Sequence, residues 1–115
     1  MTTLVKICGL NTRETMAVAL EAGADYVAFG AFYPTDTKAD TTRAEPDVLT
    51  WCQMFLTLPC AAIGGITLEN AAPLISAGAD FLAVSSGVWD HKDGPAAAVA
   101  SFNRVIEDAM AASKI

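Results

Sequence analysis

The chain has 115 residues, which is enough for one domain with a modest hydrophobic core and too few for two. Apolar residues make up 53% of it and charged residues 17%, the balance of a folded globular protein rather than of a disordered one. The formal net charge is −6 and the basic residues are scattered singly, so the sequence offers no basic stripe for nucleic acid or for an anionic membrane.

Four short apolar runs alternate with four stretches of helical character. In chain order, the predicted strands are residues 4–8, 26–29, 61–63 and 81–84, and the predicted helices are residues 11–22, 46–55, 67–77 and 95–110. Asn11 followed by Glu14 is a capping signal for the first helix, and Thr67 can cap the third. Pro46 and Pro95 stand at first helical positions, which proline favours. The pattern is (βα)4.

The apolar runs and their spacing predict a parallel sheet. The strands are apolar on successive residues, as in sheets covered on both faces, and right-handed βαβ crossovers follow. The chain also repeats itself: "EAGADYVAFG" at residues 21–30 matches "SAGADFLAVS" at residues 76–85, an offset of 55. Gly9 falls over Gly64 at the same offset, and Gly23 and Gly78 are typical of helix C-caps that lead into strands. A pair of βα modules is therefore used twice.

The predicted fold is a parallel (βα)4 half of a TIM (βα)8 barrel, with residues 1–115 forming one domain. Four parallel strands alone leave two open edges and an uncovered inner face. We therefore expect completion by self-association into a homo-oligomer, with a missing N-terminal half as the alternative. A fragment, an engineered half and an open doubly wound sheet are the other arrangements that fit the pattern.

Parallel α/β folds bind ligands at the C-terminal ends of their strands, so four loops are candidates for the site. They contain the sequences "CGLN" from residue 8, "GAFYPTDTK" from residue 30, "GGIT" from residue 64 and "SSGV" from residue 85. The small residues of the last two let backbone N–H groups approach an anion, which predicts a phosphate site. The alternative is that these glycines only permit tight turns.

The loop "AFYPTDTK" carries further groups that can bind an anion. Lys38 supplies a positive charge, and Thr35 and Thr37 supply hydroxyl donors, although a solvated turn has the same composition. Asp36 would repel an anion unless its side chain points away or meets a cation. His91, the only histidine, is expected in an exposed turn. The three cysteines lack CxxC spacing and are expected to be buried thiols.

No apolar run approaches the ~18 residues of a membrane span, and no charged leader precedes an apolar segment at the N-terminus. The sequence therefore predicts a soluble, cytoplasmic protein.

The segments "GADYVAFGAFYPTDTK" and "AIGGITLENAAPLISAGADFLAVSSGVW" resemble the second half of thiamine phosphate synthases. These (βα)8 transferases join a hydroxymethylpyrimidine diphosphate to a thiazole phosphate and release pyrophosphate. The resemblance implies that Lys38 binds the diphosphate and assists catalysis. It also implies a set of residues that hold the thiazole phosphate: Thr35, Asp36, Thr37, Gly64, Gly65, Ser85 and Ser86.

The same resemblance implies a Mg²⁺ cofactor, whose aspartate ligands come from the first half of the family's barrel and have no counterpart in this sequence. Gly9 stands where the family usually has a small hydroxyl or thiol, so that diphosphate contact is missing or moved to Cys8. We therefore expect an isolated monomer not to carry out the full reaction. A non-catalytic phosphate-binding half-barrel or scaffold is the competing class of function.

The N-terminal segment "VKICGLNTRE" is similar to the first strand and turn of phosphoribosylanthranilate isomerases, and "VSSGV" also occurs near their phosphate site. By that resemblance Cys8 would be a general base. The isomerases' acid-bearing strand and their GGTG turn have no counterpart here, so the thiamine phosphate synthase family is the preferred assignment.

Overall fold

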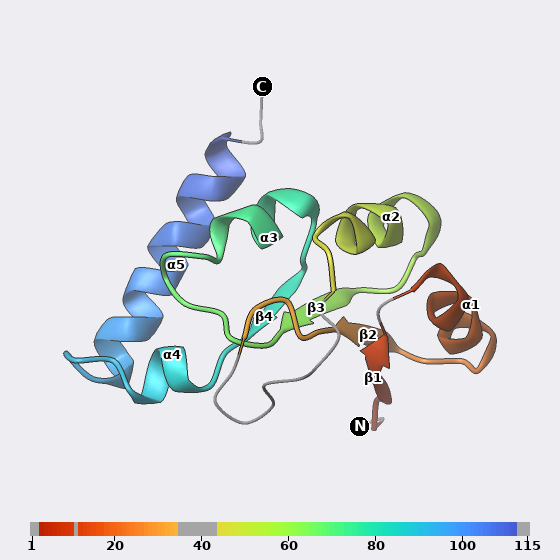
Figure 1. Ribbon diagram of the computed structural model, residues 1–115, viewed down its shortest axis with the longest axis horizontal. Coiled ribbons are helices and arrows are strands. Elements are labelled where there is room, and N and C mark those ends of the chain that lie inside the picture. Colours follow the sequence, from red (N-terminus) through yellow and green to blue (C-terminus); the bar gives the residue numbers. More distant parts are fainter. Residues whose placement is uncertain (1–2, 11, 35–43, 113–115) are drawn as a thin grey trace.

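The computed structural model describes residues 3–10, 12–34 and 44–112 (Figure 1). Its strands form a single sheet in the order β1-β2-β3-β4, with every neighbouring pair parallel. This confirms the predicted (βα)4 pattern. The elements in chain order are β1 (Lys6–Leu10), α1 (Arg13–Glu21), β2 (Tyr26–Phe29), α2 (Asp47–Phe55), β3 (Cys60–Ile63), α3 (Ala72–Ala77), β4 (Phe81–Ala83), α4 (Ser86–Trp89) and α5 (Pro95–Ala112).

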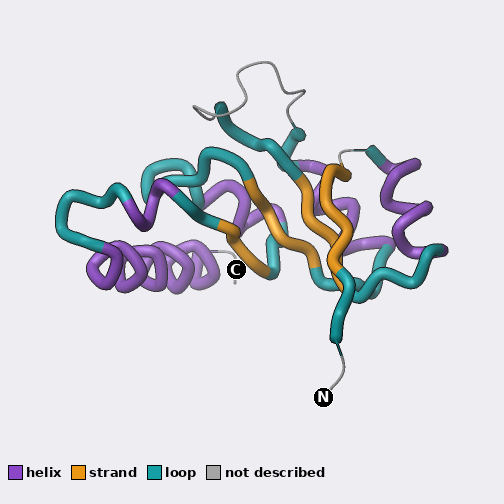
Figure 2. The backbone as a smooth tube through the Cα atoms, turned by 90° about the horizontal axis from the view of Figure 1, so that it is seen from below, coloured by secondary structure: helices purple, strands orange, loops and turns teal. Residues whose placement is uncertain are grey.

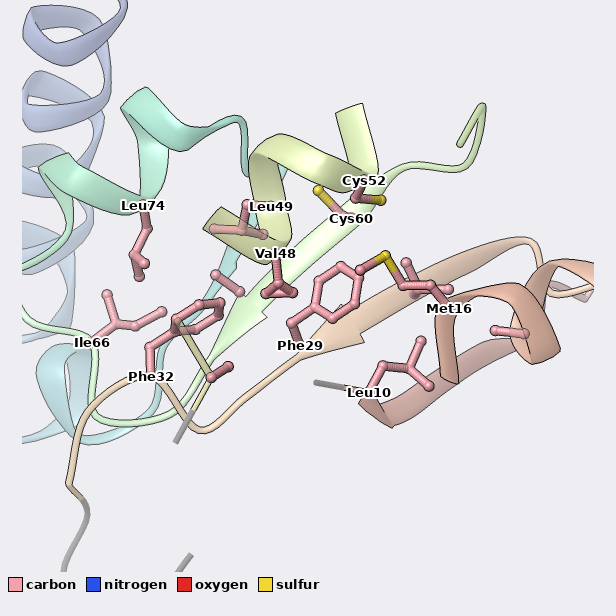
Figure 3. Close-up of a cluster of buried hydrophobic side chains, with 14 of the residues drawn as sticks. Leu10, Met16, Phe29, Phe32, Val48, Leu49, Cys52, Cys60, Ile66 and Leu74 are labelled. Carbon is pink, nitrogen blue, oxygen red and sulfur yellow. The ribbon is translucent and has the colours of Figure 1, made fainter. Parts of the chain in front are cut away.

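The hydrophobic core lies between the sheet and its helical layer. Val27, Phe29 and Cys60 are fully buried because alternate residues of β2 and β3 point toward the helices. Figure 3 shows Phe29 beside Met16 of α1 and Val48 of α2. Helices α1, α2 and α3 lie side by side in chain order on one side of the sheet, and α5 packs against α3 and α4 (Figure 1). Among the helices that the structure describes, none is long and apolar enough to cross a membrane.

The opposite face of the sheet has no helical layer in the described part of the chain (Figure 2). Large apolar side chains are exposed on it, with Phe81 56% exposed and Ile63 38% exposed. The Tyr26 and Phe81 rings meet edge to face there, with centroids 6.4 Å apart. This surface corresponds to the inside of a closed barrel.

The repeat seen in the sequence is also present in the strand pairing. Residues 55 positions apart occupy equivalent places in the β1–β2 pair and in the β3–β4 pair. The equivalent pairings are Lys6 with Tyr26 and Ala61 with Phe81, then Ile7 with Val27 and Ala62 with Leu82. The sheet is therefore built from two copies of one βαβ unit, joined where β2 pairs with β3.

Local hydrogen bonds repeat with the same period. The Val5 amide donates to Asp25 Oδ2 at 2.6 Å, and the Cys60 amide donates to Asp80 Oδ2 at 2.9 Å. Gly23 and Gly78 both adopt positive φ just after their helices, which confirms the predicted glycine termini. Each aspartate thus ties the N-terminal end of its strand to the neighbouring strand. These bonds lie at the opposite end of the sheet from the C-terminal strand ends, where the candidate site is expected.

The first strand and helix differ from the prediction at their boundaries. Strand β1 is Lys6–Leu10 rather than residues 4–8, and its pairing with β2 shifts register between Ile7 and Leu10. Asn11 lies outside the described residues. Helix α1 is instead capped by Thr12, whose hydroxyl accepts from the Thr15 amide at 3.2 Å in a capping box.

The third helix begins at Ala72, so the prediction that it starts after Thr67 was wrong. The Thr67 amide donates to Asn70 Oδ1 at 2.7 Å, and this bond closes a turn ahead of the helix. The one-turn helix α4 was not predicted. It starts at Ser86, three residues after the end of β4 at Ala83, in a segment that the sequence predicted to be a loop.

Candidate functional site

A cavity of about 580 Å³ opens at the C-terminal ends of β3 and β4. Ligands bind at this end of the strands in parallel α/β folds. The lining comes from the segments that follow β2, β3 and β4, and it contains no charged side chain among the described residues. The lining residues are Pro34, Ile63, Gly64, Gly65, Ile66, Thr67, Ala83, Val84, Ser85 and Ser86.

Two consecutive glycines form the floor turn of this cavity. Gly64 has φ +108° and Gly65 has φ +64°, a region that side chains other than glycine's rarely adopt. A Cβ on Gly64 would lie 2.5 Å from the Ala31 Cβ, and one on Gly65 would lie 2.6 Å from the Pro34 carbonyl oxygen. The turn therefore needs glycine for its backbone conformation and also for its close approach to the loop after β2.

Tyr33 and Asn70 hold the glycine turn against the loop after β2. The Tyr33 amide donates to the Gly64 carbonyl at 3.1 Å, and its hydroxyl donates to the Asn70 carbonyl at 2.8 Å. The Asn70 side chain accepts from the Thr67 amide at 2.7 Å and donates to the Gly65 carbonyl at 3.0 Å. Burial raises the pKa of Tyr33, so its hydroxyl stays protonated and can donate.

Neither Tyr33 nor Asn70 was predicted as a site residue from the sequence. The spacing in "GGITLEN" held a usable signal for Asn70, since an asparagine side chain commonly hydrogen-bonds the backbone of its own turn. The position of Tyr33 follows from the pairing of β2 with β3, for which the local sequence holds no signal.

Ser85 and Ser86 form the other wall of the cavity, and both are exposed. Ser86 and Gly87 begin α4, and the carbonyl of Ser85 at its N-cap accepts from the Val88 and Trp89 amides, both at 3.0 Å. A Cβ on Gly87 would lie 2.6 Å from the Ile66 carbonyl oxygen. Glycine there lets α4 start close to the turn after β3, so two short backbone segments share one opening.

The structure brings together four of the predicted site residues, Gly64, Gly65, Ser85 and Ser86, around this cavity. The predicted anion-binding loop, with Thr35, Asp36, Thr37 and Lys38, lies outside the described residues. Pro34, directly before it, lines the cavity.

The other two candidates do not reach this cavity. Cys8 and Gly9 lie within β1 rather than in a loop after it. Strand β1 is at the opposite edge of the sheet from β4, so one chain does not bring these residues to the serine wall.

Two buried cysteines form a separate pair behind the sheet. Cys52 of α2 and Cys60 of β3 are fully buried free thiols, as predicted, and Figure 3 shows them side by side. The pKa of Cys52 is raised mainly by a hydrogen bond with Cys60 and, to a smaller extent, by burial. The same bond is the main reason that the pKa of Cys60 is lowered.

The described residues do not suit a metal ion. Across residues 3–10, 12–34 and 44–112, no three histidine, cysteine, aspartate or glutamate side chains gather where they could hold one. Mg²⁺ prefers carboxylate oxygens, and the described residues of the cavity lining supply none.

Residues 7–88 match the family described as thiamine monophosphate synthase. The chain belongs to this family. The match begins in β1, so it includes the segment that also resembles phosphoribosylanthranilate isomerases, and it ends in α4. Both walls of the cavity therefore lie in the part of the chain that matches the thiamine monophosphate synthase family.

Relatives in this family are about twice as long. The chain is 62% identical over 96 residues to the thiamine-phosphate synthase of Rhodospirillum centenum, covering 84% of this chain and 46% of that protein. It is 60% identical over 104 residues to the thiamine-phosphate synthase of Hyphomonas neptunium, covering 88% of this chain and 47% of the relative. The chain thus spans about half the length of the curated relatives it matches.

A solved structure of the thiamine phosphate pyrophosphorylase from Pyrococcus furiosus superposes on this chain with a TM-score of 0.76 at 26% identity. The superposition covers 92% of this chain and 50% of that one. The four βα units therefore correspond to half of a thiamine phosphate synthase fold, which agrees with the half-barrel predicted from the sequence.

Proposed function

We propose that this chain supplies half of a thiamine phosphate synthase active site and that its cavity binds the phosphate group of a thiazole phosphate. Membership of the family supports the choice of substrate. The single observation that carries the proposal is the shared opening of the two small-residue turns, Gly64 with Gly65 and Ser85 with Ser86, at the C-terminal ends of adjacent strands.

The chemistry of the lining suits a phosphate monoester. Serine hydroxyls and backbone amides can each donate to a phosphate oxygen, and hydrogen bonds to an ionised acceptor are stronger than neutral ones. Among the described residues, no carboxylate lines the cavity to repel the anion. The described part of the lining would therefore hold the thiazole phosphate through neutral donors.

Lys38 is proposed to act on the second substrate. By family resemblance its ammonium group binds the diphosphate of the pyrimidine substrate, and Thr35, Asp36 and Thr37 contribute to the thiazole phosphate site. The bond between the pyrimidine's methylene carbon and the diphosphate oxygen breaks, and that carbon then bonds to the thiazole nitrogen. Lys38 would stabilise the negative charge that accumulates on the departing pyrophosphate.

The described residues do not form a site for the family's Mg²⁺. Ligands for it would have to come from a second half of the barrel. The full reaction in the cytoplasm is accordingly proposed for the completed barrel, whether the remaining strands belong to a second copy or to an N-terminal half.

Ligand-dependent melting tests the phosphate site. Thiazole phosphate should raise the melting temperature of the chain in a concentration-dependent way, because a ligand that binds only the folded state stabilises it. Ser86→Ala should weaken binding by about tenfold through loss of a donor to a charged acceptor. Ser76→Ala is the matched control, since Ser76 is an exposed serine of α3 outside the cavity. Equal shifts for both variants, or no shift with the intact chain, would contradict the proposal.

A second candidate function, binding without catalysis, is favoured by the half-length match to the relatives. Turnover assays with both substrates and Mg²⁺ separate the two. Product formation that Lys38→Ala abolishes would establish the enzyme, whereas saturable thiazole phosphate binding without product would establish the binding protein.

A further inference from the structure

The side-chain amide of Asn70 makes two hydrogen bonds of opposite sense in the turn after β3. Its oxygen accepts from the Thr67 amide at 2.7 Å, and its nitrogen donates to the Gly65 carbonyl at 3.0 Å. A backbone N–H can only donate and a carbonyl can only accept, so the two contacts fix which end of the side chain faces which neighbour. The acceptor end and the donor end of Asn70 therefore have separate roles.

The acceptor role has a counterpart in the first βαβ unit. The 55-residue offset that relates the two units places Thr12 over Thr67 and Thr15 over Asn70. The Thr12 amide donates to Thr15 Oγ1 at 3.2 Å, and the Thr15 hydroxyl donates to the Thr12 carbonyl at 2.9 Å. A threonine at this position thus closes the turn, whereas the asparagine of the second unit also brings a side-chain nitrogen to Gly65.

The donor role orients one peptide group of the glycine turn. The Gly65 carbonyl and the Ile66 N–H belong to the same planar peptide and point in opposite directions. Because the carbonyl is held by Asn70, the Ile66 N–H is turned away from Asn70. The preceding peptide is held in the same manner, since the Tyr33 amide donates to the Gly64 carbonyl at 3.1 Å. Neither donor residue is among those that line the cavity of about 580 Å³.

Glycine at position 65 does not fix this orientation by itself. Without a Cβ, Gly65 restrains the rotation of the following peptide less than any other residue would. Ile66 is buried and anchors the far side of that peptide, so the bond from Asn70 restrains the carbonyl side. A carbonyl oxygen that rotated into the cavity lining would repel an anion, whereas an N–H at the same place attracts one.

We infer that Asn70 is a positioning residue for the anion site, which keeps the N–H of Ile66 directed into the cavity by holding the Gly65 carbonyl. Gly65 and Ile66 both line this cavity. Asn70 acts through the Gly65–Ile66 peptide and does not itself contact the phosphate. The inference rests on the proposed function, because it explains how the phosphate site of that function is kept in shape.

Asn70→Thr separates the two roles. By the precedent of Thr15, a threonine can accept from the Thr67 amide and keep the turn closed, but it has no nitrogen to donate to Gly65. In an NMR titration of the isotope-labelled chain, the dissociation constant for inorganic phosphate should rise about tenfold, because one hydrogen bond to a charged acceptor is misaligned. The shift of the Ile66 amide proton on phosphate addition should shrink in parallel.

Thr50→Val is the matched control. The Thr50 hydroxyl of α2 donates to the Ala77 carbonyl at 3.0 Å, so this variant also removes one side-chain donor from a backbone carbonyl, but outside the cavity lining. Its affinity for inorganic phosphate should equal that of the unaltered chain. Equal losses of affinity in Thr50→Val and Asn70→Thr would indicate general loosening of the fold and would overturn the inference.

The direction of the Ile66 N–H, measured by residual dipolar couplings without ligand, separates this inference from the proposed function. The direction should change in Asn70→Thr, and an unchanged direction would overturn the inference whatever the phosphate titration gives. Failure of the unaltered chain to bind inorganic phosphate or thiazole phosphate would instead overturn the proposed function. Equal phosphate binding by the unaltered chain and Asn70→Thr would leave the proposed function standing and overturn the role of Asn70.

Asn70→Asp is the second variant if Asn70→Thr does not fold. The carboxylate keeps the shape of the side chain and accepts from the Thr67 amide, but it cannot donate to the Gly65 carbonyl. Its charge also repels phosphate, so this variant is judged by the direction of the Ile66 N–H alone. That direction should differ from the one in the unaltered chain, and an identical direction would overturn the inference.

Discussion

Asp80 and Cys60 exchange two hydrogen bonds across the N-terminal ends of β4 and β3. The Cys60 amide donates to Asp80 Oδ2, and the Asp80 amide donates to the Cys60 carbonyl, both at 2.9 Å. Asp25 and Val5 make the same two bonds one repeat earlier. The aspartates of the two "GAD" sequences are therefore structural clamps, located away from the candidate site.

Asp80→Ala should lower the free energy of unfolding by about 1–2 kcal/mol, because the Cys60 amide and the Gln53 side chain lose their acceptor. Asp80→Asn should cost less, since its side-chain oxygen can still accept from the amide. Urea unfolding measures both. Asp108→Ala, an exposed acidic residue of α5, should leave stability within about 0.5 kcal/mol. An unchanged free energy of unfolding in Asp80→Ala would show that these hydrogen bonds do not contribute to stability.

Gly64→Ala should destabilise the chain more than Gly23→Ala. Both glycines have positive φ, so alanine is strained at either position by roughly 1–2 kcal/mol. Only at Gly64 would the new Cβ also strike a neighbour, the Ala31 side chain at 2.5 Å, whereas Gly23 has open space. Thermal unfolding of the two variants isolates the clash, which should add about 1–3 kcal/mol. Equal losses of stability in Gly64→Ala and Gly23→Ala would mean that the loops after β2 and β3 are not closely packed.

Asn70→Ala should destabilise the glycine turn by about 1–3 kcal/mol, since the Thr67 amide and the Gly65 carbonyl both lose their partner. It should also weaken binding of inorganic phosphate or thiazole phosphate, because the turn is no longer held in place. Calorimetry and urea unfolding report the two effects separately. Asn103→Ala, on the exposed side of α5, is the control and should change neither.

Cys52→Ala should raise the pKa of Cys60. The hydrogen bond from Cys52 is the largest cause lowering that pKa, and burial, which raises it, remains after the substitution. Cys52→Ser should shift the pKa less, because a hydroxyl can donate the same bond. Thiolate absorbance followed against pH, in a Cys8→Ser background, measures the change. An unchanged titration in Cys52→Ala would exclude the interaction between the two sulfurs.

The strand order and the duplicated unit were predictable because their signals are local and repeated. Apolar runs of strand length alternate with helical stretches, and "GAD" precedes both β2 and β4. The positive φ of Gly23 and Gly78 follows from the same pattern, since only glycine enters this region easily after a helix. The grouping of Gly64 with Ser85 follows from the rule that parallel strands bring their C-terminal ends together.

The helix boundaries that were predicted wrongly depend on contacts between segments or on a choice between alternative capping residues. Thr67 has the side chain of an N-cap, but Asn70 captures its amide and delays the helix to Ala72. Thr12 and Thr15 form a reciprocal capping box, whereas the sequence predicted a cap from Asn11 with Glu14. The short helix α4 has no apolar periodicity of its own to predict it.

The tie between Tyr33, Asn70 and the glycine turn has a consequence for engineering. The Phe32 and Tyr33 amides donate to the Ile63 and Gly64 carbonyls, and the Tyr33 hydroxyl donates to the Asn70 carbonyl. The first residues of the loops after β2 and β3 therefore form one hydrogen-bonded unit. Grafting only one of them into another barrel would leave a tyrosine or an asparagine without its partner. A change of substrate preference introduced by loop exchange should therefore require residues 31–34 and 64–70 to be transplanted together.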